Sequence, residues 1–429
     1  MFRCLTLLVT LLTASASQSQ DLEYARLLVR TLSSELMDGR GYVNNGEGKA
    51  GDFIATEFGR MGLIPFGSSY FQRHSFPMNT FPGKVELSIK GKPLVPGEQF
   101  QVWAASPSIR GTYKVVPFRK NKILNDKRFN QFVNRDHRDR FIWIDKQGIE
   151  DKKVLRKLDS LRYTNISNAK GLIFVSDSKL SWSVMIGAEQ RKYPVIDVQR
   201  HSFSGKPGKI SLQVESKFIS DFQSRNVLGY IPGEIQPDTF LVFTAHYDHL
   251  GRMGDRVYYP GANDNASGTA MVLDLARHYS LPENKPYYSM VFICLSGEEA
   301  GLHGANFCAA HSPFDLKKTK FLINLDMVGT GSEGITMVNG TQFKEAFDRM
   351  VRINADNEYL MTVKERGESC NSDHCPFYKK GVPAVFIYSM GKEYGEYHNP
   401  FDRGEKVPFT EYKDIFRLVR DFMDSAGKW

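Results

Sequence analysis

The chain has 429 residues, of which 41% are hydrophobic and 12% aromatic, so a globular protein is expected and a disordered one is excluded. This length allows two domains, or one large domain with an insertion. The formal charge is +8 at pH 7, but the basic excess lies in residues 114–162, which contain no nucleic-acid-binding motif. We therefore expect a solvated basic face and no nucleic-acid partner, with weak attraction to anionic surfaces or acidic substrates as the alternative.

The first residues have the pattern of an export signal. Arg3 precedes the short apolar run Leu5–Leu12, and Ala14-Ser-Ala16 is typical of a cleavage site. The run is too short to span a bilayer, and no later stretch of 18 apolar residues occurs. We predict a cleaved signal peptide over residues 1–17, and hence a periplasmic or secreted protein without an integral membrane segment. An uncleaved anchor is the alternative.

Three further regions follow along the chain. Within residues 18–77, the amphipathic segments Leu22–Leu36 and Lys49–Met61 predict two helices of the catalytic domain. Residues 78–220 contain short β-like runs between charged helical patches, which indicates an inserted β-rich domain. In residues 221–429 strand-like runs alternate with helical ones, which predicts an α/β domain with a mainly parallel sheet covered by helices on both faces.

The last region contains four expected strands and three expected helices. The strand-like runs are Phe240–Ala245, Met290–Leu295, Phe321–Met327 and Ala384–Tyr388. The helical ones are Ala266–Tyr279, Ala300–Ala310 and Thr410–Met423. In such sheets, ligands gather at the carboxyl ends of the strands.

Histidine, aspartate and glutamate, which are common metal ligands in proteins, follow several of these strand-like runs. They are His246 and Asp248, Asp264, Glu298 and Glu299, Asp326, and His398. Singly, most have ordinary explanations, such as a helix cap for Asp264 or a solvated turn for the two glutamates. Asp326 is the sharpest signal, because an unpaired carboxylate is unexpected within an apolar strand. All of them occurring by chance is improbable, so the sequence predicts a two-metal site.

The donor types indicate which metal this site prefers. Imidazole and carboxylate without thiolate suit zinc first, then cobalt or manganese. Two zinc ions about 3.5–4 Å apart would polarise a carbonyl and hold a hydroxide between them. Of the adjacent glutamates, one can bind metal while the other takes the proton of the attacking water. Asp248, two residues after His246, is placed to accept a hydrogen bond from the second ring N–H of that histidine or from a nearby ligand.

These motifs resemble the co-catalytic di-zinc exopeptidases of clan MH, which include secreted bacterial leucyl aminopeptidases and glutamate carboxypeptidase II. The resemblance covers Asn226–Asp402 and Leu32–Gly67 and implies a three-layer zinc aminopeptidase fold. The motifs that carry it are Thr244-Ala-His-Tyr-Asp248, Gly261-Ala-Asn-Asp-Asn-Ala-Ser-Gly268, Ser296-Gly-Glu-Glu-Ala-Gly301, Asn324-Leu-Asp-Met327 and Tyr397-His398.

The resemblance also implies a role for each of these residues. It assigns His246 and Glu299 to one zinc, Asp326 and His398 to the other, and Asp264 to both. It makes Glu298 the general base and Asp248 the acid that orients the His246 site. It further implies a cis peptide bond between Asp264 and Asn265. The inserted region faintly resembles a protease-associated domain.

A substrate-side loop is indicated at residues 371–377, which resemble the corresponding loop of the family. Asp373 and His374 are therefore candidates for the substrate pocket, with a hydrogen-bonded loop anchor as the alternative. Cys370 and Cys375 bracket the core of this loop and are predicted to form a disulfide, with two free thiols as the alternative. An apolar pocket wall or the core could contain Phe377, Tyr388, Met390 and Tyr394. No chemistry is assigned to His249, His278, His303 or His311.

The function expected from these features is that of a secreted zinc aminopeptidase acting on peptides. A carboxypeptidase would need an arginine clamp for the substrate carboxylate, and only Arg366 and Arg403 lie near the motifs. A glutaminyl cyclase, a single-zinc acyl transferase of the same fold, is a second enzyme alternative. A non-catalytic binding ectodomain is a third, although such proteins typically lack some of the metal ligands.

Overall fold

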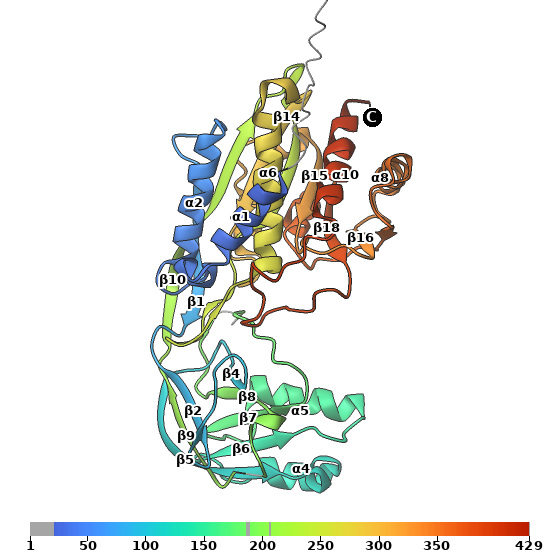
Figure 1. Ribbon diagram of the computed structural model, residues 1–429. Coiled ribbons are helices and arrows are strands. Elements are labelled where there is room, and N and C mark those ends of the chain that lie inside the picture. The colour runs from blue at the N-terminus through green and yellow to red at the C-terminus, as the bar shows by residue number, and fades with distance from the viewer. Residues whose placement is uncertain (1–20, 186–188, 206, 429) are drawn as a thin grey trace, which may run out of the picture.

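The computed structural model describes residues 21–185, 189–205 and 207–428. The predicted signal peptide, residues 1–17, lies outside the described residues. Within the described ranges, no helix is long and apolar enough to cross a membrane. The chain forms two lobes, and the antiparallel strands β1 (Phe71–Thr80) and β10 (Lys217–Ile231) run between them (Figure 1).

The upper lobe is built on an eight-stranded sheet in the order β1-β10-β14-β11-β15-β18-β16-β17. The four central strands are parallel, as predicted, whereas β10 and β16 join them in antiparallel orientation. The bounds of the remaining strands are β11 (Gln236–His246), β14 (Tyr288–Leu295), β15 (Thr319–Leu325), β16 (Gly334–Val338), β17 (Val363–Glu365) and β18 (Ala384–Met390).

Helices cover both faces of this sheet, which gives the predicted three-layer α/β arrangement. Successive residues of a buried strand point to opposite faces, so Phe243 belongs to one core and Val242 to the other. The Phe243 face packs against α1 (Leu22–Leu32), α2 (Gly46–Arg60), α6 (Gly268–Ser280), α8 (Lys344–Asn357) and α10 (Tyr412–Asp424). The Val242 face packs against α7 (His303–Ala310) and α9 (His374–Lys379).

The lower lobe contains a second eight-stranded sheet, in the order β3-β2-β9-β5-β6-β7-β8-β4, and falls within the predicted insertion. Its strands are β2 (Val85–Ile89), β3 (Lys92–Pro93), β4 (Phe100–Val102), β5 (Ile109–Phe118), β6 (Arg140–Asp145), β7 (Gly171–Ser176), β8 (Val195–Gln199) and β9 (Lys209–Val214). The helices α3 (Lys120–Ile123), α4 (Asp126–Val133) and α5 (Lys152–Thr164) accompany it (Figure 1).

One buried cluster joins the two lobes. Strand residues of the insertion such as Val102 and Ile196 share it with Leu250, Met253 and Tyr259 of the upper lobe. The two short strands β12 (Gly251–Arg252) and β13 (Tyr258–Tyr259) form the hairpin that brings these upper-lobe residues there. The insertion is therefore packed directly beside the segment that links β11 to α6.

Candidate metal centre

The carboxyl ends of the parallel strands bring the predicted ligands together. His246 is the last residue of β11, Asp326 follows β15, and Glu299 lies four residues beyond the end of β14. Asp264 lies in an irregular turn, Ala262–Ser267, directly before α6, and its own backbone is not helical. His246, Asp264, Glu299 and Asp326 are each less than 9% exposed, although they are polar. Such burial is costly for ionisable groups unless they are paired or bind a cation.

Asp264 directs one carboxylate oxygen toward each of two histidines. His246 Nε2 lies 3.5 Å from Asp264 Oδ1 and 3.5 Å from Asp326 Oδ1. His398 Nε2 lies 3.0 Å from Asp264 Oδ2 and 3.2 Å from Glu299 Oε2. The shared carboxylate is as predicted, but the pairing is not, because His246 groups with Asp326 and His398 groups with Glu299.

His249, to which the sequence assigned no chemistry, also belongs to the centre. It is fully buried, and its Nδ1 lies 2.7 Å from Glu299 Oε1. His249, Asp264 and Glu299 offer ligand atoms that are mutually close enough for one ion, as do His246, Asp264 and Asp326. No local pattern marks His249, since it follows the ligand motif in an irregular segment after the strand.

The turn that carries Asp264 is held from several sides. The peptide bond between Asp264 and Asn265 is cis, as predicted. The Asp402 carboxylate accepts hydrogen bonds from the backbone N–H groups of Asn263 (2.8 Å) and Asp264 (3.1 Å). Tyr394, a predicted pocket residue, donates its hydroxyl to Asp402 at 2.9 Å. Tyr394 thus supports the turn that positions Asp264, and its predicted place in the substrate pocket stays a prediction.

Arg40 is a second residue of the centre that the sequence did not reveal. Its guanidinium is fully buried and donates to the carbonyl oxygens of Tyr247, Leu32, Pro260 and Gly261 at 2.6–2.9 Å. Burial lowers the pKa of Arg40 to about 10, while nearby carboxylates oppose that shift. The group remains a cation at neutral pH and ties the N-terminal segment to the loops on both sides of β12 and β13.

Asp248 has a role other than the predicted one. The His246 ring donates from Nδ1 to the backbone carbonyl of Asp248 at 3.1 Å, whereas the nearer carboxylate oxygen is 3.7 Å away. The carboxylate accepts the Tyr42 hydroxyl at 2.6 Å and the backbone N–H groups of Glu298 and Glu299. Burial raises the pKa of Asp248 to about 6. The side chain therefore positions the turn that presents the two glutamates.

Glu298 is partly exposed at the edge of this buried group. Desolvation, together with the negative charges of Asp373, Glu299 and Asp326, raises the pKa of Glu298 well above its ordinary value. Adjacent Glu299 shows the opposite behaviour. Burial disfavours its ionised form, but His398 and His249 outweigh burial and lower the pKa of Glu299 to about 2. Glu299 thus stays ionised at neutral pH, whereas the surroundings of Glu298 favour its neutral form.

The donor set fits divalent metal ions. Asp326 Oδ1 is buried without a hydrogen-bond partner, and it faces His246 Nε2. Burial disfavours the charged form of His398, yet Glu299 and Asp264 outweigh burial and raise its pKa to about 11. The same carboxylates would hold a cation in place of that proton. Imidazole and carboxylate donors without thiolate suit zinc.

The loop after β17 contacts the centre through Ser372. Cys370 and Cys375 form a disulfide, which confirms that prediction. Inside the loop that it closes, Ser372 Oγ donates to Asp326 Oδ2 at 2.9 Å. Asp373 is fully buried, and burial raises its pKa to about 8.

Of the two remaining pocket candidates, His374 lies within this loop and Tyr388 lies in β18. His374 pairs through Nε2 with the carbonyl of Ser369 at 2.8 Å and is fully buried. It is therefore the loop anchor that was the alternative, not a pocket residue. Tyr388 packs its ring 5.3 Å from that of Phe386, and its predicted substrate role stays a prediction.

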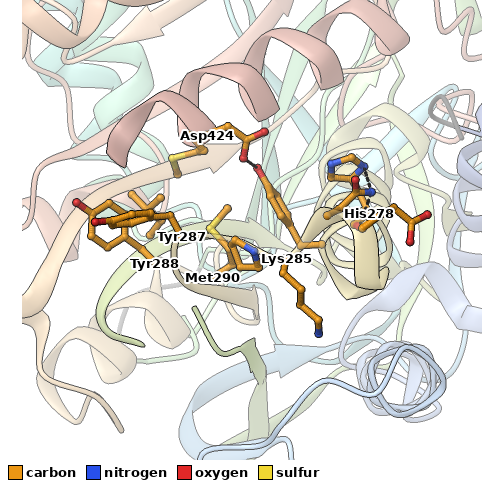
Figure 2. Close-up of a pocket in the computed structure, with 12 residues that line it drawn as sticks. His278, Lys285, Tyr287, Tyr288, Met290 and Asp424 are labelled. Atoms are coloured by element: carbon orange, nitrogen blue, oxygen red, sulfur yellow. Dashed lines mark hydrogen bonds between the residues drawn. The ribbon is translucent and has the colours of Figure 1, made fainter. Parts of the chain in front are cut away.

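A separate cavity of about 310 Å³ lies at the opposite end of the sheet (Figure 2). It is lined at the start of β14 by Tyr288, at the end of α6 by His278, and at the end of α10 by Asp424. The ligand-bearing turn follows the other end of β14, after Leu295. Neither group of potential metal ligands found among the described residues borders this cavity.

Residues 226–423 match the model of peptidase family M28. This segment of the chain belongs to peptidase family M28. The M28 segment contains all the ligand residues described above, from His246 to His398, whereas Arg40 and Tyr42 precede it. The residues that support the centre from the N-terminal side are therefore contributed from outside the matched segment.

Several known proteins are similar to the chain. Aminopeptidase YwaD of Bacillus subtilis is 28% identical over 244 residues, which is 55% of this chain and 52% of YwaD. A probable zinc metalloprotease of Leptosphaeria maculans is 32% identical over 289 residues, which is 56% of this chain and 61% of that protein. The chain thus spans between half and two thirds of the length of these curated relatives.

A solved structure shows the same fold over nearly the whole chain. BSAP, a zinc aminopeptidase from Bacillus subtilis, superposes with a TM-score of 0.67 at 20% identity and covers 94% of each chain. This likeness extends beyond the M28 segment to the lower lobe, because it covers far more than residues 226–423.

Proposed function

We propose that the protein is a secreted, zinc-dependent aminopeptidase with two zinc ions at this centre. The observation that carries the proposal is the Asp264 carboxylate, with one oxygen toward the His246–Asp326 group and the other toward the His398–Glu299 group. The names of similar proteins, which include an aminopeptidase and a probable zinc metalloprotease, support it. The disulfide at Cys370 and Cys375 is consistent with an oxidising compartment.

In this proposal, His246 and Asp326 hold one ion, His398 and Glu299 hold the other, and Asp264 contacts both. A bound zinc pair supplies Lewis-acid polarisation of the scissile carbonyl and lowers the pKa of water. The protein's own residues then handle the proton. Glu298, which binds no metal in this proposal, would accept the proton of the attacking water on its ionised carboxylate and return it to the leaving amine. Asp248 keeps Glu298 in place through its backbone N–H.

The site offers hydrogen-bond acceptors and, among the described residues, no free arginine, which favours a substrate with a free amine. Besides the ligands, Glu298 and Asp373 add carboxyl groups beside the centre. The nearby arginines are not placed to clamp a carboxylate. The Arg40 guanidinium is buried against backbone carbonyls, Arg366 is exposed, and Arg403 donates to the carbonyl of Pro400. Aminopeptidase activity is thus favoured over carboxypeptidase activity.

The test is zinc content together with hydrolysis of matched free and N-blocked aminoacyl amides by the purified protein. About two zinc ions per chain and hydrolysis that requires the free amine are expected. One zinc ion per chain with release of cyclised product would replace the proposal with a glutaminyl cyclase-type enzyme. Absence of zinc binding even after zinc is added back would indicate a binding protein instead.

A further inference from the structure

The two histidines at the centre are oriented from different parts of the molecule. His246 donates from Nδ1 to a carbonyl in its own segment, that of Asp248. His398 pairs through Nδ1, at 2.7 Å, with the carbonyl oxygen of Trp182, which belongs to the lower lobe. Trp182 lies in residues 177–185, which follow β7 and reach from the lower lobe toward the upper one (Figure 1).

Trp182 holds the backbone of His398 as well as its ring. The Trp182 N–H donates to the His398 carbonyl at 2.9 Å, so the two residues form a reciprocal pair. His398 has a φ of +52°, a left-handed conformation that a non-glycine residue adopts at a cost. The contact from the insertion therefore fixes a backbone conformation that the free loop would not favour.

The Trp182 side chain contacts both lobes. The indole Nε1–H donates to the carbonyl of Val102 in β4 at 2.7 Å, and the indole ring stacks on Tyr259 at 4.8 Å. Lys179, three residues earlier, forms an ion pair with Glu396, two residues before His398. Side chains and backbone thus tie the two loops together over several residues.

This contact determines which ring nitrogen of His398 faces the carboxylates. A carbonyl oxygen only accepts hydrogen bonds, so Nδ1 must carry the hydrogen, and Nε2 is the nitrogen left to bind a metal. Nε2 is also the atom near Asp264 and Glu299. Outer partners of this kind typically change metal affinity by about 10- to 100-fold when they are removed.

We propose that the inserted lobe is a positioning element of the metal centre, in which Trp182 orients His398 and so sets the zinc affinity of the His398–Glu299 site. The inference rests on the proposed function insofar as the centre binds zinc. It extends that function by making one of the two sites depend on the insertion, while the His246–Asp326 site is oriented within the upper lobe.

The experiment measures the zinc affinity of each site in the full-length, metal-free protein by competition with a chromophoric chelator. His398→Ala and His246→Ala variants assign the two affinities to their sites. Trp182→Ala keeps the backbone carbonyl that pairs with His398 but removes the indole that anchors this carbonyl through Val102 and Tyr259. In this variant we expect the His398 site to weaken measurably, by up to about 100-fold, the upper end of the loss when such a partner is removed outright, while the other site is unchanged. Trp182→Phe, which retains a ring against Tyr259 but loses the hydrogen bond to Val102, should give a smaller effect in the same direction.

Trp103→Ala is the matched control, because Trp103 is a half-buried tryptophan of the same lobe that packs on Tyr163 at 5.5 Å. It should leave both affinities unchanged. The double variant Trp182→Ala/His398→Ala should bind zinc as tightly as His398→Ala alone. A folded Trp182→Ala protein with both affinities unchanged would overturn the proposal, as would a weakening that persists without His398.

If circular dichroism shows that Trp182→Ala does not fold, Trp182→Phe and Lys179→Met decide the question by the same criteria. Because only zinc binding is measured, the result is independent of peptidase activity. A wild-type protein that binds two zinc ions but hydrolyses no aminoacyl amide would refute the proposed function and leave the role of Trp182 open to the same test.

Discussion

Glu298 and Glu299 are neighbours whose pKa values are shifted in opposite directions, and their glutamine variants should lose activity for different reasons. Glu298→Gln removes a proton acceptor but no ligand, so kcat should fall by about 10²- to 10⁴-fold with zinc content unchanged. Glu299→Gln, the matched variant one residue away, should lose zinc first. Kinetics on a free aminoacyl amide and elemental analysis of both proteins check this. Wild-type kcat in Glu298→Gln would exclude it as the general base.

Zinc binding should strengthen as the pH rises. The raised pKa of His398, about 11, means that its ring stays protonated in the metal-free protein throughout the neutral range. Zinc must displace that proton, and each added pH unit makes the displacement about 1.4 kcal/mol easier, or about tenfold in affinity. Glu299, with a pKa of about 2, is already ionised and adds no pH dependence.

Chelator competition at pH 6, 7 and 8, corrected for titration of the chelator, measures this slope. The His398→Gln variant is the control, since it should lose the pH dependence at its own site. An affinity of the His398 site that stays constant over this range would show that no proton leaves the ring on binding.

The identities of the ligands could be predicted from the sequence, but their grouping could not. His246, Asp264 and Asp326 stand out because carboxylates and imidazoles follow apolar runs. Which carboxylate meets which histidine depends on side-chain directions at the sheet edge, and β11 has both β14 and β15 as neighbours. Arg40 could not be predicted, because its partners are backbone carbonyls that no sequence pattern marks.

At the scale of elements, the parallel strands were the easiest to predict. Strands buried on both faces need continuous apolar runs, and β14 is buried along its entire length. Irregular elements were harder. The first helix was expected to reach Leu36 but ends at Leu32, and a 3-10 segment, Glu35–Arg40, follows with left-handed residues. The bend of that segment places Arg40 in the core, where its partners are distant in sequence. Local sequence patterns therefore could not predict it.

The disulfide-closed loop is an element whose contribution to stability can be measured. Cys370 and Cys375 are five positions apart, so closing this short loop stabilises the folded state by about 2 kcal/mol in the chain-entropy description. The double variant Cys370→Ser/Cys375→Ser should lower the free energy of unfolding in urea by that amount. Ser372 of this loop donates a hydrogen bond to Asp326, so the zinc affinity of the His246–Asp326 site should also fall in the double variant.

Reduced wild-type protein is the control for this comparison, because it lacks the bond but keeps both sulfur atoms. It should unfold at the same urea concentration as the serine double variant. An unchanged midpoint in both samples would mean that the loop is held by its buried side chains alone.

At the scale of the whole molecule, the insertion and the metal centre should stabilise each other. Linkage is reciprocal: if Trp182 strengthens zinc binding, then zinc must strengthen the contact between His398 and Trp182 by the same free energy. The Trp182 amide, which donates to the His398 carbonyl, reports on that contact directly. Its hydrogen exchange should slow when zinc is added, by about 10- to 100-fold if opening of this contact controls exchange.

Amides of α4 (Asp126–Val133) serve as the internal control, since this helix packs in a separate cluster of the lower lobe. Their exchange should not respond to zinc, and neither should the Trp182 amide in a His398→Ala protein. Equal slowing at α4 and Trp182 would indicate a global gain in stability. Slowing confined to the Trp182 segment would mean that the two lobes are coupled through one metal ligand, His398. A displacement of the insertion would then lower the zinc affinity of the His398–Glu299 site.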